Sequence, residues 1–253
     1  MDRIDLNCDM GESFGVYRLG EDDQLLASVT SANIACGFHA GDAAVMRRTV
    51  RAALERGVAL GAHPGFRDLE GFGRRALAVT PEEAYDLVVY QVGALLGFAL
   101  AAGGRLAHVK PHGALYNQAA RDASLAGAIA SAVRDVDRSL VLFGLAGSEL
   151  VAAGAHAGIA TAAEAFADRN YTGDGALVAR ARPDALVRDP ATAAARVVRM
   201  VREARVTSVD GADVALRPDT ICIHGDAPGA PVLARAVRTA LEQAGIRVCA
   251  VGG

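Results

Sequence analysis

Short apolar segments alternate with amphipathic segments along the whole chain of 253 residues. The apolar segments predict β-strands at 3–9, 31–37, 58–62, 105–110, 139–145, 159–163, 220–224 and 246–251. The segments between them predict helices at 20–28, 42–57, 80–103, 122–138, 148–157, 190–205 and 229–244. Regular alternation of strand and helix is typical of a parallel sheet with right-handed crossovers, so the pattern indicates an α/β fold.

The chain shows no linker-like stretch, so we expect one domain over residues 1–253, decorated by a short hairpin at 206–216. An open doubly wound sheet and a closed (β/α) barrel both fit the alternation. The turn at residues 7–12, NCDMGE, lacks the G-x-G-x-x-G of dinucleotide sites and would bring two carboxylates toward a pyrophosphate. This turn argues against the dinucleotide-binding form of the open sheet.

Polar side chains of one parity cluster where the predicted strands end. Asp5, Asn7 and Asp9 share one face of the first strand, because successive side chains point to opposite faces. Ionisable groups on an inward face are costly unless they line a site, and barrel enzymes place their chemistry at the carboxyl ends of strands. We therefore favour a TIM-like (β/α) barrel. Three further sets follow the same parity: His108, Lys110 and His112; Glu164, Phe166 and Asp168; Cys222, His224 and Asp226.

Charge and composition exclude several classes of function. The net charge of −3 gives no basic footprint for nucleic acid or for an anionic membrane. Lys110 is the single lysine among 26 basic residues, and it precedes Pro111, so the chain has no Walker-type phosphate loop. A lysine retained where arginine usually serves can lose its proton or present a compact ammonium to an anion. Chance survival of that codon is the alternative.

Cysteine usage and the apolar stretches predict a cytoplasmic protein. The four cysteines are scattered without a CxxC pair, and the first residues lack the layout of a signal peptide. The long uncharged stretch at 87–104 follows a helix-start signal at 80–83, and we interpret it as part of a buried helix rather than a membrane span. The oligomeric state is open, and a homo-oligomer is one option.

Several strand-end residues are candidates for metal or substrate binding. His39 and His63 both end strands beside glycines, and with Asp9 they offer the three ligands of a divalent metal with one position open to water. Satisfied structural histidines are the alternative. The D-x-N-x-D start at residues 5–9 resembles a calcium loop, but its continuation does not. Arg74 with Arg75, and Asp168 with Arg169, are candidates for binding an anion or are solvated loop charges.

The sequence resembles the LamB/YcsF family, to which the A component of 5-oxoprolinase belongs, from about residue 4 to residue 250. The segments that carry the resemblance are 5–15, 31–42, 61–65, 71–75, 109–117, 164–169 and 223–226. It implies a barrel of the glycoside hydrolase/deacetylase type, commonly seven-stranded. It also implies ATP-dependent opening of 5-oxo-L-proline to L-glutamate, with ATP as co-substrate accompanied by Mg²⁺, and with partner subunits B and C.

From the residues themselves we expect Asp9 to act as base or metal ligand, Lys110 as an electrostatic clamp and His112 as a proton carrier, with His63 a further candidate base. A stand-alone metal-dependent amidohydrolase or deacetylase is one rival function, and a non-catalytic scaffold of the complex is another. The remaining candidates are expected to bind substrate: Asn7, Glu12, His39, Arg74, Arg75, Asp168, Arg169, His224 and Asp226.

Overall fold

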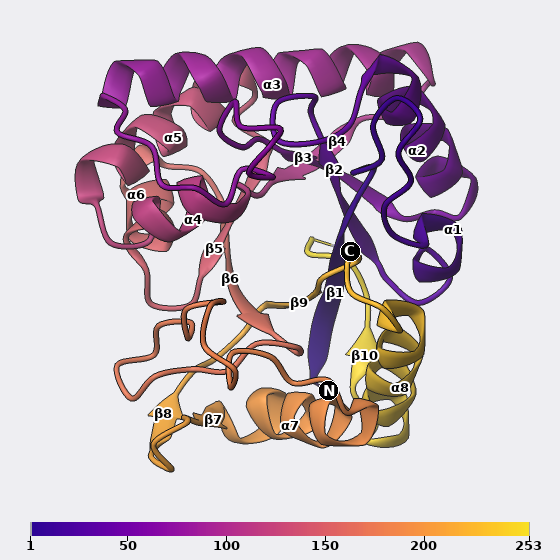
Figure 1. The fold of residues 1–253 in the computed structure, drawn as a ribbon, viewed down its shortest axis with the longest axis vertical. Helices are drawn as coiled ribbons and strands as arrows, with labels where there is room; N and C mark the ends of the chain where they lie inside the picture. The colour runs from indigo at the N-terminus through magenta and orange to yellow at the C-terminus, as the bar shows by residue number, and fades with distance from the viewer. Residues whose placement is uncertain (1, 253) are drawn as a thin grey trace.

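Seven parallel strands close into a barrel in the computed structural model, which describes residues 2–252 (Figure 1). Strand β9 pairs with both β6 and β1, and this double pairing closes the ring. The predicted (β/α) barrel and its seven strands are confirmed. In ring order the strands are β1 (Arg3–Met10), β2 (Ser31–Ala35), β3 (Ala59–His63), β4 (Leu106–Val109), β5 (Val141–Leu145), β6 (Thr161–Phe166) and β9 (Thr220–Ile223).

The eighth predicted strand lies outside the ring. Strand β10 (Arg247–Val248) pairs with Arg3 and Ile4 at the start of β1, ahead of the residues of β1 that pair with β9. The sixth strand also runs further than predicted, from Thr161 to Phe166, so Glu164 and Phe166 lie within the strand rather than after it.

Helices surround the barrel as the alternation predicts (Figure 1). The sequence did not predict the helix at Gly113–Ala119 (α4), and the helix predicted at 20–28 is shorter in the structure, where it spans Asp22–Leu25 (α1). The predicted hairpin forms as β7 (Arg205–Thr207) and β8 (Asp213–Ala215), which pair antiparallel. The helices are α1 (Asp22–Leu25), α2 (Ala43–Glu55), α3 (Pro81–Ala101), α4 (Gly113–Ala119), α5 (Ala123–Val136), α6 (Glu149–Ala157), α7 (Pro190–Glu203) and α8 (Ala230–Gln243).

Helix α3 is the one helix of the described residues whose length and composition would let it cross a membrane. It begins with a capping box between Thr80 and Glu83, as the helix-start signal predicts. Gln91 lies buried in the middle of α3. Its side-chain amide donates to the carbonyl oxygen of Gly65 and accepts from the backbone nitrogen of Gly65. The inner face of α3 is therefore fixed to the loop after β3.

A glycine in β3 lets two polar side chains meet inside the barrel. Asn33, Gly61 and His108 are register partners on β2, β3 and β4. The His108 ring crosses the space above Gly61, and its Nε2 lies 2.7 Å from Asn33 Oδ1. The ring also stacks on Phe143 at 4.2 Å, and burial lowers the pKa of His108 to about 3, so this histidine is neutral.

Gly61→Ala is expected to destabilise the fold by at least ~1–3 kcal/mol, because the new Cβ would lie 1.9 Å from His108 Nε2 and force the ring to move. Gly97→Ala in α3 is the matched control. It meets no heavy atom within 4 Å and should raise stability by ~0.5–1 kcal/mol through helix propensity. Urea unfolding of both variants provides the measurement, and equal effects would contradict the packing argument.

A second polar group lies near the amino end of β1. Asp5 is buried, and its carboxylate accepts hydrogen bonds from the hydroxyls of Thr30, Ser31 and Thr220. Burial raises the pKa of Asp5 to about 6, against the lowering effect of these three hydroxyls. The folded protein therefore keeps a proton on this carboxyl at pH values where the unfolded chain has lost it.

Because the folded pKa of Asp5 exceeds the unfolded value, the free energy of unfolding should fall as the pH rises from about 4 to about 6. The contribution of this one group is about 3 kcal/mol. Asp5→Asn removes it, so the stability of the variant should decline less over the same interval. Urea unfolding at closely spaced pH values compares the two slopes, and parallel slopes would refute the assignment.

Candidate active site

A cavity of about 620 Å³ opens at the carboxyl ends of the barrel strands. Its walls come from the strand ends, from α4 and from the loop at 169–180, in which the sequence had marked only Arg169. The cavity brings together seven of the predicted site residues: Asp9, His63, Arg74, Lys110, His112, Arg169 and His224.

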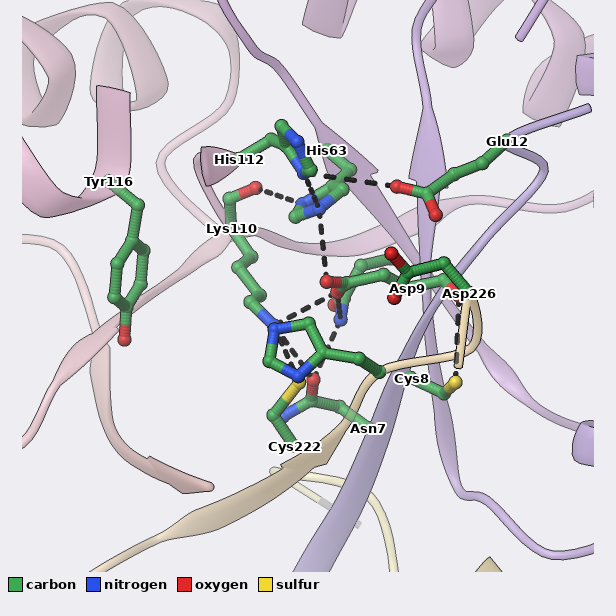
Figure 2. A network of polar contacts seen from close by, with 12 residues as sticks. Asn7, Cys8, Asp9, Glu12, His63, Lys110, His112, Tyr116, Cys222 and Asp226 are labelled. Atoms are coloured by element: carbon green, nitrogen blue, oxygen red, sulfur yellow. Dashed lines mark hydrogen bonds and ion pairs between the residues drawn. The ribbon is translucent and has the colours of Figure 1, made fainter. Parts of the chain in front are cut away.

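Lys110 is at the centre of the polar network, with its side chain 3% exposed (Figure 2). Its Nζ lies 2.9 Å from Asp9 Oδ1 and 2.9 Å from Glu164 Oε1. It also donates to Asn7 Oδ1 at 3.3 Å and to Cys222 Sγ at 2.9 Å. Burial lowers the pKa of Lys110, but Asp9, Cys222 and Glu164 together raise it by more, so the net pKa is well above the usual value. Lys110 is therefore a permanent cation.

The two oxygens of Asp9 have different surroundings. Oδ1 accepts from Lys110 Nζ and from Asn33 Nδ2, each at 2.9 Å. Oδ2 lies 3.4 Å from His63 Nε2. Burial raises the pKa of Asp9, but His63 in its protonated form and Lys110 lower it more, so the net pKa is well below the usual value and the group is a carboxylate.

Four residues of this network were absent from the predicted site: Asn33, Glu164, Tyr116 and Cys222. Glu164 Oε1 pairs with Lys110 and accepts from Asn7 Nδ2 at 3.0 Å, while its Oε2 accepts from the Tyr116 hydroxyl at 2.7 Å. The parity of strand positions already marked Glu164 as inward-facing. Asn33 has the same signal in the second predicted strand, whereas Tyr116 depends on helix α4, which no pattern predicted.

Four buried side chains form a second group beside the network: Glu12, His39, His63 and His112. The rings of His39 and His112 stack at 3.7 Å with an interplanar angle of 4°. Burial lowers the pKa of both rings well below the usual value and raises the pKa of Glu12. Gly65 and Gly73 let the backbone close over the stack, since a Cβ on either would lie 2.7 Å from His39.

Asp9 and His39 belong to different groups of potential metal ligands within residues 2–252. Asp9 lies with Cys222 and His224, whereas His39 and His63 lie with Glu12 and His112. A metal held by Asp9, His39 and His63 together stays a prediction.

The pair formed by Asp168 and His224 flanks the cavity. Asp168 accepts from His224 Nδ1 at 2.9 Å, and His224 stacks on Phe166 at 5.4 Å. Burial raises the pKa of Asp168, but His224 lowers it more, so Asp168 is ionised. Because Nδ1 faces Asp168, the other nitrogen of His224 is available to the cavity that the ring lines.

Arginines supply positive charge along the same cavity. Arg74, Arg169 and Arg180 line it, and Arg74 pairs with Asp226 at 2.7 Å. Burial and then Arg180 lower the pKa of Arg169 to about 10, and its Nε is buried without a hydrogen-bond partner. These guanidiniums can bind an anion.

Six predicted residues lie off the cavity wall: Asn7, Glu12, His39, Arg75, Asp168 and Asp226. Five of them support residues that line the cavity or stack on one. Arg75 does not, since its guanidinium pairs with Asp68 and its side chain is 60% exposed. The structure therefore separates Arg74 from Arg75, because the chain turns at 71–73 and sends the two side chains to different partners.

Comparison with known proteins identifies the family. The sequence profile of the LamB/YcsF family matches residues 4–253. The chain belongs to the LamB/YcsF family. A family relative from Tolumonas auensis, named as the A subunit of 5-oxoprolinase, is 60% identical and covers 99% of this chain and 100% of its own length.

A solved structure of a protein with half of its residues identical extends the likeness to the fold. The crystal structure of a lactam utilization protein from Thermus thermophilus has a TM-score of 0.93 and 50% identity, covering 98% of this chain and 99% of that chain. A family 4 carbohydrate esterase from Streptomyces lividans has a TM-score of 0.47 and 12% identity, covering 98% and 91%.

For this LamB/YcsF protein, Lys110→Met should cost ~3–5 kcal/mol of stability, because it leaves the carboxylates of Asp9 and Glu164 buried without a cation. Adding Glu164→Gln should recover part of that loss, since one uncompensated charge is removed. A double-mutant cycle by urea unfolding measures the coupling. Additive costs would show that the Lys110–Glu164 pair contributes no interaction energy.

Proposed function

We propose that this chain is the A subunit of an ATP-dependent 5-oxoprolinase, which converts 5-oxo-L-proline to L-glutamate with release of ADP and phosphate. In this proposal it works with partner subunits B and C. The observation that carries the proposal is the buried Lys110 cation, paired with Asp9 and Glu164 in a cavity that arginines also line. The relatives are named as the A subunit of 5-oxoprolinase, and this name supports 5-oxoproline as the lactam substrate.

The chemistry of a lactam explains the need for ATP. An amide carbon is a poor electrophile, and transfer of the γ-phosphoryl group to the lactam oxygen activates it while ADP leaves. Water then adds to the ring carbon and loses a proton. The C–N bond breaks as the ring nitrogen takes up a proton, giving an acyl phosphate that a second water hydrolyses to glutamate and phosphate.

Residues of the cavity suit the anions along this path. Arg74, Arg169 and Arg180 are placed to hold the substrate carboxylate or the phosphoryl group. The unpartnered Nε of Arg169 is a donor that such an anion would satisfy. Lys110 contributes a fixed positive charge, which stabilises negative charge as it develops on the reacting carbonyl.

Proton transfer is assigned to two carboxylate–histidine neighbours. Asp9 Oδ2 accepts the proton of the attacking water, since Oδ1 is already held by Lys110 and Asn33. His224 gives a proton to the ring nitrogen, and Asp168 fixes its tautomer and orientation. His112 is less suited to direct transfer, because its ring nitrogens face Phe72 O and His63 Nε2.

A stand-alone metal-dependent amidohydrolase or deacetylase is the second candidate function. The group of three histidines and Glu12 favours it, because such ligands support hydrolysis without ATP. Release of acetate or amine in the absence of nucleotide would distinguish it from the first candidate.

Reconstitution tests the proposal directly. The chain mixed with subunits B and C, 5-oxoproline and ATP should form glutamate and ADP in equal amounts, and omission of this chain should abolish glutamate. Lys110→Arg should keep the fold, checked by circular dichroism, and lose at least ~100-fold in turnover, because a planar guanidinium cannot replace the compact ammonium among its four partners.

His156→Gln is the matched control and should match the wild-type rate, since His156 lies exposed in α6. Wild-type turnover by Lys110→Arg would remove the proposed role of Lys110. Full activity after combined alanine substitution of Asp9, Lys110 and His224 would instead support a non-catalytic scaffold.

A further inference from the structure

One ring nitrogen of His63 faces one ring nitrogen of His112, and the opposite nitrogen of each ring faces a backbone carbonyl (Figure 2). His63 Nδ1 lies 2.7 Å from the carbonyl oxygen of Lys110, and His112 Nε2 lies 2.8 Å from the carbonyl oxygen of Phe72. A carbonyl oxygen only accepts hydrogen bonds, so both of these ring nitrogens carry hydrogen.

The other two ring nitrogens then have no hydrogen in the neutral imidazoles. His63 Nε2 and His112 Nδ1 lie 2.9 Å apart, so two nitrogen lone pairs come within hydrogen-bonding distance of each other inside the protein. Such a contact is repulsive unless a cation binds both nitrogens. Asp9 Oδ2, another acceptor, lies 3.4 Å from His63 Nε2 and adds to the excess of lone pairs.

Glu12 brings a carboxylate to the same place. Its Oε1 lies 3.8 Å from His112 Nδ1 and 3.3 Å from His39 Nε2. All four residues are at most 5% exposed, and their ligand atoms lie within 4.8 Å of one another. The contact between His39 Nε2 and Glu12 Oε1 holds this carboxyl group beside the two bare nitrogens.

We propose that His63 Nε2, His112 Nδ1 and the Glu12 carboxylate bind a divalent transition-metal ion. Backbone carbonyls behind both imidazoles are the arrangement that orients metal-ligating histidines. Two imidazoles and a carboxylate suit Mn²⁺, Fe²⁺, Co²⁺, Ni²⁺ or Zn²⁺. His63 and His112 also line the cavity, so a further coordination position faces substrate or water.

The separation of the two nitrogens bears on coordination number. Ligand nitrogens about 2.1 Å from a metal and at right angles to it are about 3.0 Å apart, whereas a tetrahedral angle separates them by about 3.4 Å. The observed 2.9 Å is closer to the right-angled case. It favours an ion with five or six ligands over tetrahedral zinc.

The test uses the full chain alone, without ATP, substrate or partner subunits, so its outcome is independent of the proposed function. Protein stripped with chelator is titrated with Co²⁺ by calorimetry, with the visible absorption of Co²⁺ as a second readout. One ion per chain is expected. Absence of stoichiometric binding would overturn the proposal and leave a proton shared by the two histidines as the cation.

Three variants locate the site, with folding checked by circular dichroism. His63→Gln and His112→Gln should each weaken Co²⁺ binding by at least about 100-fold, and Glu12→Gln by about 10–100-fold. His156→Gln is the matched control and should bind as the wild type does. Unchanged affinity in the three variants would contradict the assignment.

A measurement on wild-type protein covers the case in which a histidine variant does not fold. X-ray absorption of the Co²⁺-loaded chain should show two imidazole rings in the coordination shell. A shell without imidazole would overturn the proposal.

Discussion

The buried ion triad of Lys110, Asp9 and Glu164 is the constraint on which the rest of the interior depends. Two carboxylates and one ammonium lie together where water has little access, and each would be prohibitively costly alone. Neighbouring side chains donate further hydrogen bonds to the two carboxylates: Asn7 and Tyr116 donate to Glu164, and Asn33 donates to Asp9. Removing any one partner leaves a buried charge short of hydrogen bonds.

The barrel accommodates this polar interior because the strands confine it to one face. Leu6, Cys8 and Met10 of β1 are fully buried on the face opposite Asn7 and Asp9, within the apolar core beneath the helices. Gly61 supplies the space that His108 needs to reach Asn33. Alternation of side chains along a strand thus lets one segment build both the hydrophobic core and the site.

Much of this architecture could be predicted from the sequence. Short apolar segments located the strands, and parity placed Asp9, Lys110 and His224 on inward faces near the carboxyl ends of their strands. The sequence does not give the register between neighbouring strands, so it could not predict that His108 lies beside Gly61 and crosses over it.

The features that the sequence did not predict were missed for physical reasons. Helix α4 is only seven residues long and carries no side-chain N-cap, so its pattern is too short to detect. Arg180 lies in a loop without strand or helix, where periodicity gives no signal. Arg74 and Arg75 look equivalent in sequence, and only the turn before them decides that Arg74 faces the cavity and Arg75 pairs with Asp68.

Lys110 serves the site through two separate parts of one residue. Its ammonium holds Asp9 Oδ1, while its backbone carbonyl accepts from His63 Nδ1 and fixes the tautomer of that ring. Pro111 follows it and disfavours helical backbone at Lys110, which helps to keep the carbonyl aimed at His63. Substitution of the side chain removes the first contact and leaves the second. The network around Asp9 and the histidine group are thus covalently joined at Lys110 yet separable by mutation, because one depends on its side chain and the other on its backbone.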